Sequence, residues 1–162
     1  MDPVKPLPGP TAASPVSALQ SHLGYWLRFV SNHVSDGFRQ QVETRGVTVS
    51  EWVILRALYD EGCNSAGALV QALGLGKAAV SKLLDRLLDK GLVQRTVQTQ
   101  DRRNHTVTLT SAGRGLVPVL ARLADDNDQA FFGALSGPER AALLATLQEL
   151  VRTHGLRASP VN

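Results

Sequence analysis

The chain has 162 residues, of which 43% are hydrophobic and 19% charged, so it is long enough to bury a core without disulfides or a metal. Its apolar runs are too short for a membrane-spanning helix, and the single cysteine, Cys63, excludes an intramolecular disulfide. The net charge of +3 is concentrated, because residues 76–105 carry seven basic and three acidic residues, whereas the rest carries ten basic and eleven acidic residues. Such a concentration is typical of proteins that bind a polyanion.

The N-terminal part is predicted to be a flexible arm followed by a long helix. Residues 1–15 contain five of the eight prolines among small residues, which indicates an arm outside the core. Over residues 16–45, apolar side chains recur at steps of three and four, which predicts a helix. Further apolar side chains lie off that stripe, so we expect the helix to pack both on its own domain and on another subunit.

Three shorter helices are predicted next. Thr48 and Glu51 form a capping box before a helix that ends near Glu61, and Ser65 caps a short helix that ends near Leu73. After the tight turn at residues 74–76, a helix over residues 77–90 places its leucines on one face and its polar residues on the other. Asp85 and Asp89 are expected to pair with neighbouring lysines or arginines at i±4.

The spacing then changes from helical to alternating. Residues 93–97 and 105–109 predict a β-hairpin with a basic tip between them. Two more helices are predicted, over about residues 111–134 and from the capping box of Ser136 and Glu139 onward. The predicted fold class is therefore mainly α with a small β-hairpin wing: a winged helix-turn-helix lobe plus a helical dimerisation region.

The order of these elements points to DNA. A major groove about 12 Å wide admits one helix, and a basic hairpin beside that helix reaches a neighbouring groove or phosphates. We expect the helix over residues 77–90 to present Lys77, Ala78, Ser81, Lys82 and Arg86 to DNA, with further contacts from Ser65, Arg95, Arg102 and Arg103.

The sequence resembles the MarR family of bacterial and archaeal transcriptional regulators over residues 17–155. The motifs that carry the resemblance are SEWVIL at 50–55, LGLGKAAVSKLLDRLLDKGLVQR at 73–95, DRRNHTVTLTSAG at 101–113 and LSGPERAALLATLQEL at 135–150. The resemblance implies a homodimer joined through the first and the last two helices, a palindromic operator in double-stranded DNA, and a small ligand between the dimerisation and DNA-binding regions. It also implies that Asp101 orients a wing arginine, for which Arg103 is the expected partner. On this basis residues 16–156 form one domain, with a winged lobe at about 48–110 and dimerisation helices at about 16–45 and 111–156.

A ligand pocket is predicted on the first two helices. Aromatic and polar residues gather there, and either Arg56 or His33 would be the polar anchor for a small, anionic aromatic effector. The residues of this predicted set are Tyr25, Trp26, Phe29, His33, Trp52 and Arg56. An ordinary core seam between the helices is the alternative interpretation for each of them.

Other functions are less well supported by the residues. No nucleotide-binding loop, GxSxG or HExxH motif is present, so we expect neither an enzyme nor a cofactor. His22 and His33 are about 16 Å apart along the helix and cannot share a metal, and we expect no metal site. A redox-sensing regulator that uses Cys63, and a winged-helix module that binds protein instead of DNA, are the alternative functions. The first ten residues lack a hydrophobic segment of signal-peptide length, so we expect a cytoplasmic protein without membrane contact.

Overall fold

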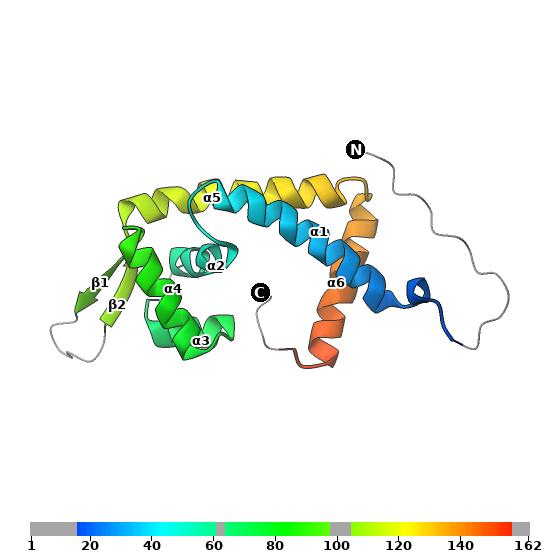
Figure 1. Cartoon of the computed structure of the whole chain (residues 1–162), viewed down its shortest axis with the longest axis horizontal. Helices are drawn as coiled ribbons and strands as arrows, with labels where there is room; N and C mark the ends of the chain where they lie inside the picture. Colours follow the sequence, from blue (N-terminus) through cyan, green and yellow to red (C-terminus); the bar gives the residue numbers. More distant parts are fainter. Residues whose placement is uncertain (1–15, 61–63, 98–104, 157–162) are drawn as a thin grey trace.

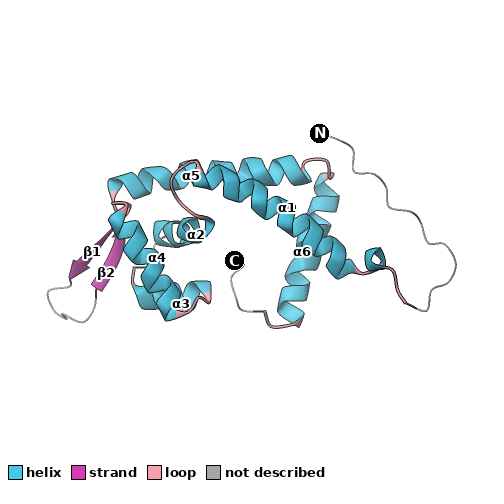
Figure 2. Cartoon of the chain, in the orientation of Figure 1, coloured by secondary structure: helices cyan, strands magenta, loops and turns pink. Residues whose placement is uncertain are grey.

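The computed structural model describes residues 16–60, 64–97 and 105–156, without the side chains of Val97 and His105. Figure 2 shows a helical molecule with one hairpin, which confirms the predicted fold class. The elements in chain order are η1 (Leu19–Ser21), α1 (Leu23–Glu43), α2 (Val49–Tyr59), α3 (Ala66–Leu73), α4 (Lys77–Asp89), β1 (Val93–Val97), β2 (His105–Leu109), α5 (Ser111–Phe132) and α6 (Gly137–Thr153).

The predicted caps of three helices are confirmed. Thr48 accepts a hydrogen bond from the amide of Glu51 at 3.2 Å, and the Glu51 carboxylate accepts one from the amide of Thr48 at 2.8 Å. Ser65 likewise accepts from the amide of Ala68 at 3.1 Å. At the start of α6, the Ser136 hydroxyl and amide both donate to Glu139 and lower the pKa of its carboxyl. This last cap is therefore complete at neutral pH and weakens as the pH falls through that lowered pKa.

The predicted start of the first helix was wrong, whereas the second helix ends close to the expected position. The first helix begins at Leu23 instead of residue 16, because residues 19–21 form a separate 3-10 turn and His22 is extended, with φ −98° and ψ 125°. Leu19 continues the apolar stripe, but it is 71% exposed and has no core to hold it in a helix. The second helix ends at Tyr59, because Asp60 turns to an extended conformation.

The helices form two groups joined by α5. In Figure 1, α5 runs along the molecule from the hairpin to the start of α6, and α1 crosses beside it. The buried Asn127 of α5 joins the two helices, because its side-chain amide donates to the carbonyl of Val34 in α1 at 3.1 Å. A side chain at Gly37 would lie 2.8 Å from the Asn127 amide oxygen, so glycine permits this close crossing.

The hydrophobic core lies under the lobe formed by α2, α3, α4 and the hairpin. Its fully buried side chains come from every helix that borders the lobe, and they include Val42, Ile54, Leu55, Leu69, Val80, Leu84, Leu87 and Leu120. The hairpin is antiparallel, with Val93 opposite Leu109, and the amide of Val107 donates to the carbonyl of Asn64 at 2.8 Å. The wing is thereby attached to the segment that leads into α3.

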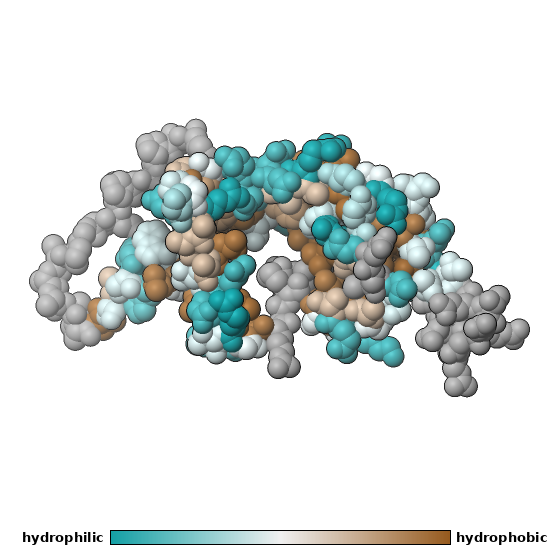
Figure 3. Space-filling model, turned by 180° about the vertical axis from the view of Figure 1, so that it is seen from behind, coloured by the Kyte–Doolittle hydropathy of each residue, from teal (hydrophilic) through white to brown (hydrophobic). Residues whose placement is uncertain are grey.

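The other end of the molecule exposes apolar side chains. No residue of α6 is buried, and α6 exposes Leu143, Leu144, Leu147, Leu150 and Val151 by 37–56%. The first half of α1 likewise exposes Leu23, Trp26, Leu27, Phe29 and Val30. In Figure 3, brown apolar surface lies in the hollow beside the arm formed by α6. Within the described ranges, no helix is both long and apolar enough to cross a membrane.

Candidate nucleic-acid interface

Helix α4 has one buried and one open face. Its apolar residues Val80, Leu83, Leu84 and Leu87 are buried against the lobe. The open face carries the exposed residues that the sequence assigned to DNA, namely Lys77, Ala78, Ser81, Lys82 and Arg86. The core therefore fixes the helix while its cations remain accessible to a polyanion.

The turn before α4 sets its direction. Gly74 adopts the left-handed conformation, with φ +65°, and its amide donates to the carbonyl of Val70 at 3.0 Å, which ends α3. Gly76 then begins α4 in an extended conformation. Ser65 lies at the start of α3, half-buried, and its hydroxyl oxygen is engaged as the helix cap.

An ion pair joins α4 to the wing. Arg95 on β1 donates to Asp85 on α4 at 2.8 Å, and both side chains are exposed. The expectation that Asp85 pairs within its own helix was wrong, because the hairpin folds back and brings Arg95 beside it. The pair orients Arg95 along the same side of the lobe as α4 and partly neutralises it.

The tip of the wing lies outside the described residues. This applies to the predicted contacts Asp101, Arg102 and Arg103, and also to Cys63.

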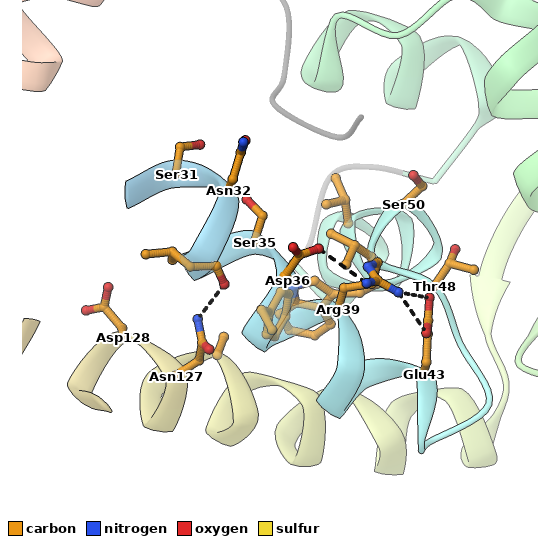
Figure 4. Close-up of a pocket in the computed structure, with 16 residues that line it drawn as sticks. Ser31, Asn32, Ser35, Asp36, Arg39, Glu43, Thr48, Ser50, Asn127 and Asp128 are labelled. Carbon is orange, nitrogen blue, oxygen red and sulfur yellow. Dashed lines mark hydrogen bonds and ion pairs between the residues drawn. The ribbon is translucent and has the colours of Figure 1, made fainter. Parts of the chain in front are cut away.

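A cavity of about 830 Å³ lies between α1, α2 and α5, beside the lobe (Figure 4). Its apolar wall includes Val34, Phe38, Trp52, Val53 and Ala124, and its polar wall includes Ser31, Asn32, Ser35, Thr48, Ser50 and Asn127. It thus combines an aromatic surface with hydrogen-bonding groups, as small-molecule sites do.

The cavity lining contains charged side chains of both signs. Arg39 donates to Asp36 at 3.2 Å and to Glu43 at 3.3 Å, and these two carboxylates raise the pKa of its guanidinium. Figure 4 shows Arg39 between the two carboxylates, with Asp128 on the opposite side. Asp128 is in turn paired with Arg140 of α6. The cavity lining thus contains one arginine, Arg39, and three carboxylates, and each of these carboxylates has an arginine partner.

The structure divides the predicted ligand set into three places. Trp52 is the one member that lines the cavity. Tyr25, Trp26, Phe29 and His33 form a row of ring contacts on the first half of α1, with centroids 4.6–6.4 Å apart. Arg56 pairs with Asp60 at 2.5 Å and lies over the ring of Tyr59 at 6.0 Å. Ligand contact by these five remains a prediction.

Sequence reasoning missed the charged group at this cavity. Asp36, Arg39 and Glu43 follow the i,i+3 and i,i+4 spacing of helix ion pairs, so the spacing alone could have paired them. Nothing local indicates that Asn127 faces the same cavity, since it is 93 positions from its partner Val34. Among the described residues, no group of three or more histidine, cysteine, aspartate or glutamate side chains is arranged to hold a metal ion.

Comparison with known proteins agrees with a DNA-binding lobe. The sequence profile of the MarR family matches residues 47–105. The chain is 30% identical to the HTH-type transcriptional repressor NicR of Pseudomonas putida over 129 residues, which cover 80% of this chain and 82% of NicR. It is 28% identical to the transcriptional regulator HosA of Escherichia coli over 115 residues, which cover 71% of this chain and 85% of HosA.

Solved structures share the fold. Bordetella bronchiseptica BpsR, whose DNA binding is regulated by 6-hydroxynicotinic acid, has a TM-score of 0.72 and 30% identity, covering 83% of this chain and 96% of BpsR. The Staphylococcus aureus MepR–DNA complex has a TM-score of 0.73 and 26% identity, covering 82% of this chain and 98% of MepR.

Proposed function

The chain belongs to the MarR family, and from that premise we propose that it represses transcription until a small aromatic molecule enters the α1/α2/α5 cavity. Membership makes it a DNA-binding transcriptional regulator that acts as a dimer, and not an enzyme. The repressor assignment follows NicR, and the aromatic effector follows BpsR. A DNA partner and a single cysteine also favour the cytoplasm.

The observation that carries DNA binding is the open face of α4. We propose that Ser81 and Lys82 reach base edges, while Lys77, Arg86 and Arg95 contact phosphates and Ser65 contacts the backbone from the start of α3. The proposed interface extends to the wing tip through Arg102 and Arg103, and Asp101 is proposed to orient one of them, Arg103. In this arrangement residues 48–110 form the DNA-binding lobe, and α1, α5 and α6 join the two subunits.

Two substitutions on α4 separate positioning from base recognition. Lys77→Ala should weaken binding to all sequences and lower the salt slope by about 1 per lost phosphate contact. Lys82→Ala should instead change the preferred bases, at about 1–3 kcal/mol for each lost base contact. The measurement is fluorescence anisotropy with selected and scrambled duplexes at several salt concentrations.

Asp89→Asn is the control, because it changes one charge on α4 outside the proposed contacts. If Lys77→Ala and Lys82→Ala each leave affinity, base preference and salt slope unchanged, α4 is not the recognition helix.

The cavity is proposed as the effector site because it contacts both groups of helices. Its walls come from α1 and α5, which belong to the dimerisation region, and from α2, which belongs to the lobe. The two recognition helices must lie about 34 Å apart to enter successive major grooves. An effector that binds more tightly when these helices have a different separation weakens DNA binding. A coupling free energy of about 1.4 kcal/mol between the two sites corresponds to a tenfold loss of affinity.

The effector site is tested with 6-hydroxynicotinic acid, the compound that regulates BpsR, and with its uncharged amide. Trp52→Ala should abolish release of DNA by either compound, because Trp52 is part of the cavity wall. Arg122→Ala is the control and should respond as the native protein does, because Arg122 is exposed on α5 and is not among the residues that line the cavity. An Asp36→Asn, Glu43→Gln variant should bind the carboxylate several-fold more tightly, because Arg39 is then free to pair with it. If neither compound loosens DNA, or if Trp52→Ala responds normally, the cavity assignment is wrong.

A further inference from the structure

A single ammonium group joins three helix ends in the lobe. Lys90 caps the C-terminus of α4, and its Nζ donates to the carbonyl of Gly46 at 2.8 Å and to the Glu51 carboxylate at 2.7 Å. Gly46 follows the end of α1, and Glu51 lies in the first turn of α2. Lys90 therefore connects the recognition helix directly to the point where the chain passes from α1 to α2.

The acceptors of Lys90 are held firmly. The Glu51 side chain is 1% exposed and also closes the capping box with the amide of Thr48. Gly46 adopts a left-handed conformation with φ +76°, which only glycine takes readily, so its carbonyl direction is fixed by the turn. A buried carboxylate requires a cationic or hydrogen-bonding partner, and Lys90 supplies the cation.

We infer that Lys90 is a positioning residue for DNA recognition. By holding the C-terminal end of α4 against the α1–α2 turn, Lys90 fixes the angle of the recognition helix relative to the dimerisation helices. That angle sets the separation of the two recognition helices in the dimer, which must match the separation of the two half-sites. Lys90 itself contacts no DNA in this role. The inference rests on the dimeric DNA binding described above.

The same connection passes beside the cavity. Thr48 and Ser50, which flank the helix start capped by Glu51, line the cavity wall. A molecule that displaces this end of α2 therefore moves the acceptor of Lys90 and, through it, the end of α4. In this account α4 has two orientations relative to the dimerisation helices, and DNA favours one of them whereas the effector favours the other.

The test measures the separation of the recognition helices directly. Ser81 is exposed on α4, so a nitroxide spin label can be attached to a Ser81→Cys variant in a Cys63→Ser background. Pulsed electron paramagnetic resonance then measures the distance between the two labels of the dimer, one on each recognition helix. The native lysine should give one narrow distance distribution. Lys90→Met removes the ammonium and should broaden or shift the distribution. Arg45→Met removes one positive charge beside Gly46 and should leave it unchanged.

Unlabelled variants supply a second readout. Inserting one base pair between the half-sites separates them by about 3.4 Å and rotates them by about 36°, which the native protein should strongly disfavour. Lys90→Met should lose about fivefold or more of this discrimination, with the salt slope on non-specific DNA unchanged. A purely structural role would lower all affinities by the same factor and leave the ratio intact.

Lys90→Arg is a second variant, which keeps the test decisive if Lys90→Met does not fold. It keeps a cation opposite Glu51, but its planar guanidinium cannot hold both acceptors in the geometry of the ammonium, so the distribution should still broaden. If every folded Lys90 variant keeps the native distance distribution and spacing ratio, the inference is overturned. A protein that sediments as a monomer, or selects no DNA from a random pool, would overturn the proposed function and with it this inference.

Discussion

Gly113→Ala is expected to lower the free energy of unfolding by about 3 kcal/mol or more, because it forces an atom into the backbone of a neighbouring segment. Gly113 is buried in the first turn of α5, and an added Cβ would lie 2.0 Å from the carbonyl oxygen of Leu92. That oxygen accepts a hydrogen bond from the amide of Thr110 at 3.1 Å, and the Thr110 hydroxyl donates to the carbonyl of Gly91 at 2.7 Å. The clash therefore falls where α4, the wing and α5 meet.

Chemical denaturation followed by circular dichroism measures this effect, at one protein concentration because dimer stability depends on it. Gly115→Ala is the matched control. It lies two residues further along the same helix, exposed and with nothing near its missing Cβ, so alanine should stabilise α5 by about 0.5–1 kcal/mol. If the two variants unfold at the same denaturant concentration, the contact between Gly113 and Leu92 does not hold the lobe to α5.

The sequence predicted helix starts well because caps are local. The signals at Thr48, Ser65 and Ser136 each lie within four residues of the amide or carboxylate that they bind, so spacing alone identifies them. The hairpin was predicted for a similar reason, since alternation over residues 93–97 and 105–109 is a property of the strands themselves. The start of α1 was not, because Leu19 fits the helical period although no packing holds it there.

Site features that depend on a single helix could be predicted from the sequence, whereas contacts between distant segments could not. The exposure of Lys77, Ser81 and Lys82 follows from the leucine stripe on the same helix. The contact of Lys90 with Glu51 joins residues 39 positions apart, and that of Arg95 with Asp85 requires the hairpin to fold back. For the cavity, the aromatic cluster on the first two helices suggested Arg56 or His33 as the polar anchor, whereas the cation in the cavity lining is Arg39, already paired with two carboxylates.

A charged substitution on the apolar face of α6 should have the largest effect on DNA binding. In a homodimer the same substitution is present in both subunits, so it disturbs the interface twice. Leu147 is 38% exposed in the single chain and shares its face with Leu143 and Leu150, so a second subunit must cover it. A glutamate at position 147 would bury two charges at a two-fold interface, one from each subunit. Burying them costs at least about 4 kcal/mol, which raises the dimer dissociation constant about a thousandfold. A monomer can fill only one half-site and loses the gain from binding two linked sites.

Leu147→Glu should therefore sediment as a monomer near 17.4 kDa at micromolar concentration and bind operator DNA about a thousandfold more weakly, close to its non-specific affinity. Ala145→Glu is the control, since it adds the same charge two residues earlier, about 160° around the helix from Leu147. That variant should remain a dimer and keep its operator affinity. Analytical ultracentrifugation and anisotropy at one fixed salt concentration measure both quantities on the same samples. If Leu147→Glu remains a dimer with native affinity, the two subunits are joined through α1 and α5 alone, and the apolar face of α6 requires another explanation.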